Sequence, residues 1–461
     1  MPRRRAVQRP SGRHPAGGSS AQAGSKPLSR RRLLRLLGQA AIAGSALELY
    51  GLGGYGATGT KIAPASSEDL TDTQLMEQME RRGFQYFWEQ ANPETGLVKD
   101  RAKAIGVDTR TLASIAATGF GLTALCIGDS RRYQLPARIR DRVMATLRFF
   151  HSRAPGRNGF FYHYMDVNTG QRTGGSEVSP IDTAILLCGV LTCRAYFQDP
   201  EIEKLATEIY DRVEWPWMLD GGGTFSQGWT PERGFFRLRW DTYCELMMMY
   251  LLAMASRRHP IPASNWNAWA RPTMSYHGMT YIVADAPLFA HQFSHAWFDF
   301  RAKHDGYANY FKNSATATQA HKLFCLSLAD RFPDYSENLW GISSSDSADG
   351  YVAWGGPPPM GPIDGTVVPS AAAGSIPFLP RQTLAVLQNI HRTYRNSGWT
   401  RYGFTDAFNP LTKWYDTDVV GIGLGISLLM AENSRTQLVW NTFMKSEEAQ
   451  LGMTRAGLKK Y

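Results

Sequence analysis

Cysteine is scarce in this chain, and its spacing indicates neither a metal centre nor a disulfide framework. The 461 residues include five cysteines, an odd number, and no two have the C-x-x-C spacing of many zinc sites. Cys126, Cys188, Cys193 and Cys244 stand in apolar runs, where cysteine usually behaves as a small buried hydrophobe. We therefore expect the fold to depend on its hydrophobic core alone.

Net charge is also lacking once the amino-terminal segment is set aside. The chain carries 50 Lys or Arg against 40 Asp or Glu, a formal charge of +10. Residues 1–64 hold 11 of the bases and one acid, so the remaining 39 bases and 39 acids cancel. Because a phosphate-binding surface needs a basic patch on the folded body, the composition gives no support to nucleic-acid binding.

Several motifs that would identify a chemistry are missing. The three glycines at 221–223 lack the Lys-Ser/Thr ending of a phosphate loop, and no G-x-S-x-G nucleophile elbow occurs. His291 and His295 have a spacing that can hold zinc, but Gln292 stands where a zincin has Glu. We expect no metal and no other cofactor, and expect these histidines to bond sugar hydroxyls or neighbouring helices.

The amino-terminal segment is typical of an export signal. Arg31 and Arg32 precede a mildly apolar stretch that ends near Tyr55, as in twin-arginine signals. The alternative is a membrane anchor, but charged and glycine residues within the stretch make a poor spanning helix. We predict a signal over 1–55, a linker over 56–70, recognition by the twin-arginine export machinery, and a periplasmic or secreted location.

Helical periodicity dominates the rest of the chain. In 71–91, Leu75, Met79, Phe84 and Phe87 recur at roughly helical spacing. Further helices are predicted at 111–127, 136–153, 179–197, 200–213, 237–256, 287–303, 307–330, 380–396, 419–433 and 435–447. About six helical hairpins without a fixed sequence repeat favour an all-α fold, an (α/α)6 toroid, as one monomeric catalytic domain over 71–461.

Long loops between the predicted helices carry many aromatic residues. Segments 213–236, 257–286 and 331–379 hold seven tryptophans, namely Trp215, Trp217, Trp229, Trp266, Trp269, Trp340 and Trp354. A tryptophan in a long loop can simply hold that loop to the body. Several of them beside acids favour a cleft in which sugar faces stack on aromatic rings.

The first candidate acid is Asp182, at the start of a predicted helix. Ser179, Pro180 and Asp182 fit the cap, first and third positions of a helix, where a carboxylate also benefits from the helix dipole. Capping and catalysis are both open for Asp182, and they are compatible when the helix end faces a cavity. Glu177, just before the cap, is the weaker catalytic candidate.

The second candidate acid is Glu245, within an apolar run that predicts a helix. Met248, Met249 and Leu252 would share its helical face, so the carboxyl group needs a partner or an upward-shifted pKa. A raised pKa is what a general acid near neutral pH requires. The alternative is a structural contact with Arg237 or Arg239, or with the hydroxyl group of Tyr243.

These segments together resemble the bacterial glucoamylase-like domain family, which includes endo-β-1,2-glucanases. The matching segments, spread over about 84–444, include Phe87-Trp88-Glu89, Gly96 to Arg101, Ala117 to Leu122, Gly159-Phe-Phe-Tyr-His163, Ile181 to Ala184, Trp229 to Phe235, Trp240 to Glu245, His291 to Arg301, Trp340-Gly-Ile, Asp364-Gly-Thr, Tyr402 to Asn409 and Glu432-Asn433. The resemblance implies an (α/α)6 toroid, chemistry without a metal, and acids on inner helices that cleave glycosidic bonds.

The same resemblance implies roles for individual residues. Glu245 matches an acid implicated in activity, and Asp182 aligns with another. Many endo-glucanase members have Asp-x-x-Glu-Thr where this chain has Ser179-Pro-Ile-Asp182-Thr, so one acid is replaced by serine and the other is shorter. This difference bears on the glucan linkage and on how water is positioned, and some relatives transfer glycosyl groups instead of hydrolysing.

The sequence thus predicts an exported glycoside hydrolase acting on a β-glucan, most plausibly β-1,2-linked. Glu245 is assigned as general acid and Asp182 as partner base or sugar-binding carboxylate, since glycosidases use pairs of carboxyl groups. Residues expected in the sugar subsites are Asp100, Arg101, Glu177, Trp240, Tyr243, His291, His295, Trp399 and Asp406. The alternatives are a transglycosylase on the same glucans, a polysaccharide lyase, and a non-catalytic glycan-binding protein.

Overall fold

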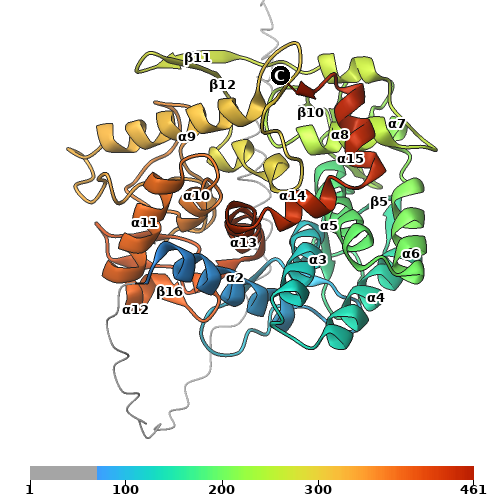
Figure 1. Cartoon of the computed structure of the whole chain (residues 1–461), viewed down its shortest axis with the longest axis horizontal. Coiled ribbons are helices and arrows are strands. Elements are labelled where there is room, and N and C mark those ends of the chain that lie inside the picture. The colour runs from blue at the N-terminus through green and yellow to red at the C-terminus, as the bar shows by residue number, and fades with distance from the viewer. Residues whose placement is uncertain (1–69, 461) are drawn as a thin grey trace, which may run out of the picture.

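The computed structural model describes residues 70–460. This range is mainly helical, with short strands in the connections, which confirms the predicted helical class (Figure 1). The predicted signal over 1–55 and residues 56–69 of the predicted linker lie outside the described residues. The longer helices are α2 (Asp72–Glu89), α3 (Ile115–Ser130), α4 (Pro136–Ser152), α5 (Pro180–Phe197), α6 (Pro200–Asp211), α8 (Met247–Ala255), α9 (Tyr310–Ser327), α11 (Pro380–Thr393), α13 (Gly421–Arg435) and α15 (Glu447–Arg455).

Short elements occupy the connections. The short helices are α7 (Trp215–Met218), α10 (Pro369–Ala373), α12 (Arg395–Gly398), α14 (Leu438–Phe443), and the 3₁₀ turns η1 (Ala263–Asn267), η2 (Leu288–His291) and η3 (Phe293–Ala296). Strands β1 (Val98–Lys99), β3 (Leu112–Ser114) and β6 (Tyr164–Asp166) form one antiparallel sheet in the order β1-β3-β6. The other strands form antiparallel pairs: β2 (Arg101–Lys103) with β20 (Asp418–Val420), β4 (Gly156–Arg157) with β5 (Phe160–Phe161), β7 (Phe225–Ser226) with β10 (Arg239–Trp240), β8 (Trp229–Thr230) with β9 (Gly234–Phe235), β11 (Thr273–Tyr276) with β12 (Met279–Ile282), β13 (Lys303–His304) with β21 (Lys459–Lys460), β14 (Ser344–Ser345) with β15 (Val352–Ala353), β16 (Trp399–Thr400) with β17 (Gly403–Phe404), and β18 (Phe408–Asn409) with β19 (Trp414–Tyr415).

The core forms around the helices that are apolar on every side. Nearly all residues of α3 and of the first four turns of α5 are buried, as expected for helices without a polar face. Helix α3 packs against α5, α2 and α13, while α4 and α6 pack outside them (Figure 1). In Figure 1, α13 lies near the middle of the view and the other helices are arranged around it. The closed (α/α)6 ring and the single-domain boundary at residue 71 stay predictions.

Two glycines allow α3 and α5 to approach closely. A methyl group on Gly119 would lie 2.4 Å from the carbonyl oxygen of Ile185 on α5. A methyl group on Gly189 would lie 2.2 Å from the carbonyl oxygen of Gly119. Because both obstacles are backbone atoms, the two helices are held at a spacing that only glycine permits at these positions.

Helix α5 is long and apolar enough to cross a membrane by length and composition alone. In this structure 72% of its most apolar window is buried inside the protein body. Its burial is typical of a core helix, because the neighbours that cover it are other helices of the same chain.

Two predicted helices are wrong in extent. Of the predicted helix 237–256, only α8 forms, because the segment before α8 pairs with distant loops. Strand β10 pairs with β7, and the backbone amide of Tyr243 donates to the Ala270 carbonyl, 2.8 Å away. Of the predicted helix 287–303, only η2 and η3 form. There the side-chain amide of Gln292 donates to the Ala371 carbonyl, 2.9 Å away, which ties this segment to α10.

Candidate active site

One large pocket opens where the amino-terminal ends of several helices meet. Its walls include Ser114 before α3, Asp182 in the first turn of α5, Ser370 in α10 and Ile422 in α13. The pocket encloses about 1350 Å³ of empty space, including its open mouth. Its wall combines apolar and aromatic side chains with a few acids, as in ligand-binding clefts. Helix amino termini also carry partial positive charge, which favours carboxylates on the wall.

Glu245 lies on this pocket wall, as predicted, but not on a helix. It precedes the first residue of α8, and its carbonyl oxygen accepts a hydrogen bond from the Ser294 hydroxyl, 2.7 Å away. The same hydroxyl accepts the amide of Met248, 3.1 Å away, and so joins η3 to the start of α8. The argument from an apolar helix face is therefore wrong, while the placement in the cleft is confirmed.

Two of the residues considered as structural partners of Glu245 also have contacts elsewhere. The guanidinium of Arg239 donates to the backbone carbonyls of Leu219 and Thr224. The Tyr243 hydroxyl lies 3.2 Å from Nδ1 of His291. Glu245 is 5% exposed, so its carboxyl group faces the pocket from a largely dry wall.

Asp182 takes part in the start of helix α5 and also lies on the pocket wall, while its catalytic role stays a prediction. The Ser179 hydroxyl caps α5 by accepting the amide of Asp182 at 3.2 Å, and it also contacts Oδ2 of Asp182 at 2.5 Å. The helix start predicted from Ser179, Pro180 and Asp182 is thus confirmed. Because the end of α5 faces the pocket, the capping carboxyl group is also a pocket residue.

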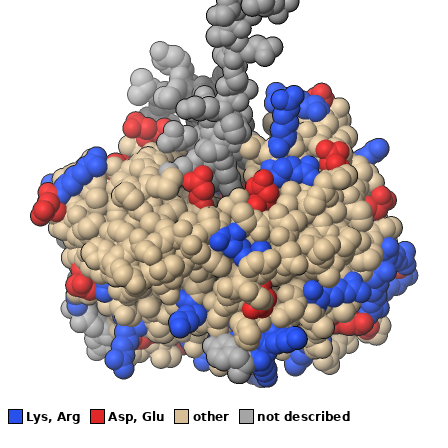
Figure 2. Space-filling view, turned by 90° about the horizontal axis from the view of Figure 1, so that it is seen from above, with Lys and Arg blue, Asp and Glu red and all other residues tan. Residues whose placement is uncertain are grey.

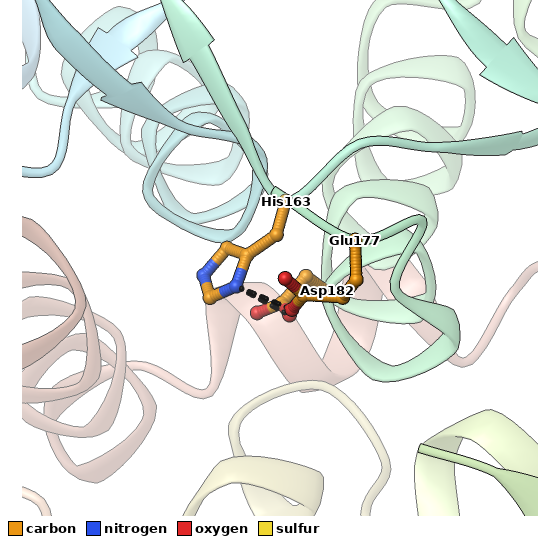
Figure 3. A group of neighbouring side chains, drawn as sticks. All are labelled: His163, Glu177 and Asp182. Atoms are coloured by element: carbon orange, nitrogen blue, oxygen red, sulfur yellow. Dashed lines mark hydrogen bonds and ion pairs between the residues drawn. The ribbon is translucent and has the colours of Figure 1, made fainter. Parts of the chain in front are cut away.

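His163 is the member of this group that the sequence did not single out. Its Nδ1 lies 3.1 Å from Oε1 of Glu177 and 3.5 Å from Oδ2 of Asp182 (Figure 3). Its ring stacks on Tyr164, with centroids 3.8 Å apart. The Gly159-to-His163 segment was part of the family resemblance, and only the folded structure brings this imidazole to the two acids.

The pKa values of His163 and Asp182 depend on their neighbours in this cluster. Burial alone would lower the pKa of His163, but Asp182 and Glu177 outweigh it and raise the pKa to about 9. Burial raises the pKa of Asp182, and the charges of Glu177 and Glu245 raise it further, while His163 and the Ser179 hydroxyl lower it. At neutral pH the pocket therefore contains an imidazolium between two acids.

A titration of His163 should show this elevated pKa directly. With histidine-selective labelling, we expect its ring resonance to titrate near pH 9, against an ordinary value of 6.5. The ion pairs stabilise the fold fully below about pH 6.5, and that contribution is lost as the pH rises through about 9. In Glu177→Gln the midpoint should fall, because one of the acids that favours the imidazolium is removed. A midpoint that stays in place would contradict the coupling.

A second group of acids surrounds Arg101 at the same pocket. Arg101 forms ion pairs with Asp100, 3.1 Å away, and with Asp346. Oδ2 of Asp406 accepts the backbone amide of Asp346 at 2.9 Å. Burial raises the pKa of Asp406 well above its usual range, and the carboxyl groups of Asp346 and Asp416 raise it further. Asp406 is therefore a candidate for a carboxyl group that stays protonated near neutral pH.

Seven of the eleven predicted site residues line this pocket. They are Asp100, Arg101, Glu177, Asp182, Trp240, Glu245 and Asp406. Four others, Tyr243, His291, His295 and Trp399, do not line this pocket, and their assignment to the sugar subsites stays a prediction.

The four residues that do not line this pocket have structural partners. His291 contacts Tyr243, and Nε2 of His295 lies 3.0 Å from the Ser314 hydroxyl on α9. Burial lowers the pKa of both histidines to about 3, so they stay neutral. Trp399 packs on Phe404 and under the guanidinium of Arg82, 5.1 Å from the ring centroid. Hydrogen bonding to neighbouring elements, one of the two alternatives for the histidines, is confirmed.

The loop tryptophans are also structural. None of the seven lines the pocket, and five of them are buried in the body. Trp266 donates its indole N–H to Asp305, 2.8 Å away, and Arg271 stacks on Trp269. Aromatic walls of the pocket come instead from Tyr164, Phe236, Trp240, Phe289, Phe293 and Tyr351.

Two clusters among the described residues have the spacing of metal ligands. In the His163–Glu177–Asp182 cluster, the imidazole is protonated, and its positive charge balances the acids as a metal cation would. In the Asp346–Asp416–Asp418 cluster, the Arg101 and Arg110 guanidinium groups pair with Asp346 and Asp418. Bound guanidinium and imidazolium groups account for both clusters, and metal-free chemistry stays a prediction.

Comparisons with known proteins give a matching sequence family and similar solved structures. Residues 237–447 match the sequence family described as "Glycoamylase: Putative glucoamylase". An endo-β-1,2-glucanase structure from Chitinophaga pinensis, in complex with sophorotriose and glucose, aligns with a TM-score of 0.78 and 26% identity, covering 85% of this chain and 99% of that one. Residues 237–447 of the chain are thus similar to glucoamylase-like proteins.

Two further relatives come from Parabacteroides distasonis. A β-1,2-glucanase structure aligns with a TM-score of 0.79 and 25% identity, over 85% of this chain and 61% of that one. An exo β-1,2-glucooligosaccharide sophorohydrolase (non-reducing end) is 26% identical over 441 residues, 86% of this chain. The chain spans 59% of the length of that curated relative.

Proposed function

We propose that this chain is a glycoside hydrolase that cleaves β-1,2-linked glucans by carboxylic acid chemistry. The observation that carries the proposal is that Glu245, Asp182 and Asp406 line one pocket, where burial raises the pKa of Asp182 and of Asp406. Glycosidases need one carboxyl group that donates a proton and one that activates water or attacks the sugar. The relatives named for β-1,2-glucan cleavage support the linkage.

Within this proposal, Glu245 donates the proton to the leaving oxygen. Asp182 acts as partner base or binds a sugar hydroxyl. The His163 ring is held in its orientation by Glu177 and Asp182. The carboxyl separation would be about 5 Å for retention and about 6.5–9.5 Å for inversion of the anomeric configuration. We also infer that the helices form an (α/α)6 toroid, and that the leader directs the enzyme to the periplasm or cell exterior.

The polysaccharide lyase alternative fits the pocket less well. A lyase needs a cation to neutralise a uronate, and Arg101, the arginine among the described lining residues, is already paired with Asp100 and Asp346. A hydrolase has no such requirement.

A panel of glucans tests the proposal. We expect the purified full chain to release new reducing ends from linear β-1,2-glucan at least about tenfold faster than from β-1,3-, β-1,4- or α-1,4-glucans, because the pocket must position one linkage at the acids. Ultraviolet-absorbing product ends would indicate a lyase. Failure to cleave any of these glucans would contradict the proposal and favour a glycan-binding protein.

A further inference from the structure

The charged side chains that line the pocket are mostly acids. Five carboxyl groups face it, from Asp100, Glu177, Asp182, Glu245 and Asp406, against Arg101 and His163. Counted formally with both cations charged, Asp406 protonated and Glu245 carrying the proton that it is proposed to donate, three negative and two positive groups leave −1. The body outside residues 1–64 has no net formal charge, so this excess is a local property of the pocket.

Both pocket cations are already neutralised by protein carboxylates. Arg101 bridges Asp100 and Asp346, and His163 bridges Glu177 and Asp182. An anionic group on a ligand would therefore find no unpaired cation on the wall formed by the described residues. Such an anionic group would also be repelled by the carboxyl groups of Asp346 and Asp416, which are neighbours of Asp406.

We propose that this pocket selects uncharged glucan chains and rejects chains whose sugar units carry anionic substituents, such as succinyl or phosphate esters, near the bond to be cleaved. This selection rests on the proposed glucan hydrolysis. It deepens that proposal, because it assigns the pocket a charge preference in addition to a linkage preference.

The pKa shifts of the acids indicate the electrostatic repulsion that an anion would experience in the pocket. Beyond the effect of burial, the carboxyl groups of Asp346 and Asp416 raise the pKa of Asp406, so a further negative charge near Asp406 is disfavoured. At Asp182 the lowering effect of His163 on the pKa is larger than the raising effect of either Glu177 or Glu245. A substituent anion would experience the same repulsion, strengthened by the partly dry walls. On the outer face shown in Figure 2, acidic and basic side chains are interspersed and form no comparable single-sign patch.

The test compares three forms of one linear β-1,2-glucan: unmodified, succinylated, and acetylated to the same degree. Acetyl groups add bulk without charge, so the succinyl-to-acetyl ratio isolates electrostatics. We expect kcat/KM for the succinylated chain to be roughly tenfold or more below that of the acetylated chain at low salt. The gap should narrow in about 1 M salt, where the screening length is about 3 Å. Equal rates on both chains at low salt would overturn the proposal.

A matched pair of variants locates the effect. Asp100→Asn should raise the succinyl-to-acetyl ratio roughly threefold, the effect of one unit charge at about 7 Å in a water-like medium. Asp141→Asn, on the exposed side of α4, should leave the ratio unchanged. Since the ratio is taken within one variant, any change in overall activity cancels. An unchanged ratio in Asp100→Asn would count against the proposal.

Binding of the three chains, measured by calorimetry, separates this proposal from the hydrolysis itself. If the unmodified glucan binds without being cleaved, the proposed hydrolysis fails, while weaker binding of the succinylated than of the acetylated chain still supports charge selection. If none of the chains binds, both proposals are overturned.

Discussion

Glu245→Gln is expected to lower kcat on linear β-1,2-glucan by about 10²–10⁴-fold, the usual contribution of a general acid or base. The amide has the shape of the carboxyl group and cannot deliver a proton to the leaving oxygen. Substrate binding should change much less, because the pocket walls stay in place. Steady-state kinetics of reducing-end release, with calorimetric binding of the unmodified glucan, give both quantities.

The control for this variant is the same substitution on the surface. Glu201 lies on α6 and pairs with Arg148 in an exposed position, with 47% of its side chain accessible. Glu201→Gln should keep wild-type kcat and wild-type stability, since exposed ion pairs contribute about 0–1 kcal/mol. If Glu245→Gln kept the wild-type kcat, Glu245 would not be the general acid. Asp182 and Asp406 would then be the remaining candidates.

Gly119→Ala is expected to lower the free energy of unfolding by about 1–3 kcal/mol, despite the helix-favouring effect of alanine. The new methyl group would lie 2.4 Å from the Ile185 carbonyl oxygen, a backbone atom that cannot move without shifting α5. Alanine gains about 1 kcal/mol over glycine in a helix interior, which the overlap outweighs. Urea unfolding followed by circular dichroism measures the difference.

Gly306→Ala is the matched control, because no atom lies within 4 Å of the added methyl group. It should leave stability close to that of the wild type. Since Asp182 stands in the first turn of α5, Gly119→Ala should also reduce kcat by displacing that turn. A Gly119→Ala protein as stable as Gly306→Ala would mean that α3 and α5 are farther apart than described.

The sequence predicted those features that local patterns determine. The buried helices α3 and α5 follow from runs without polar residues, and the start of α5 follows from Ser179, Pro180 and Asp182. Asp182 and Glu245 both line the pocket, and their catalytic roles stay predictions. In each case the signal lay within a few consecutive residues.

The features that sequence reasoning missed depend on contacts between distant segments. The backbone amide of Tyr243 donates to the Ala270 carbonyl, and this hydrogen bond keeps the turn that carries Glu245 out of helix α8. His163 lies in a short connection without periodicity, and its elevated pKa exists only because Glu177 and Asp182 reach it. The loop tryptophans were assigned to the cleft because local composition does not distinguish a ring that binds sugar from one that holds a loop.

The pairing of β2 with β20 has a consequence for when the protein first becomes active. Arg101 and Val420 are paired, so the pocket wall joins segments from near both ends of the described chain. A growing polypeptide therefore cannot assemble this wall until almost all of it has been synthesised, and such distant pairings form late in folding. Pocket formation, and any activity that depends on it, therefore follows the synthesis of β20.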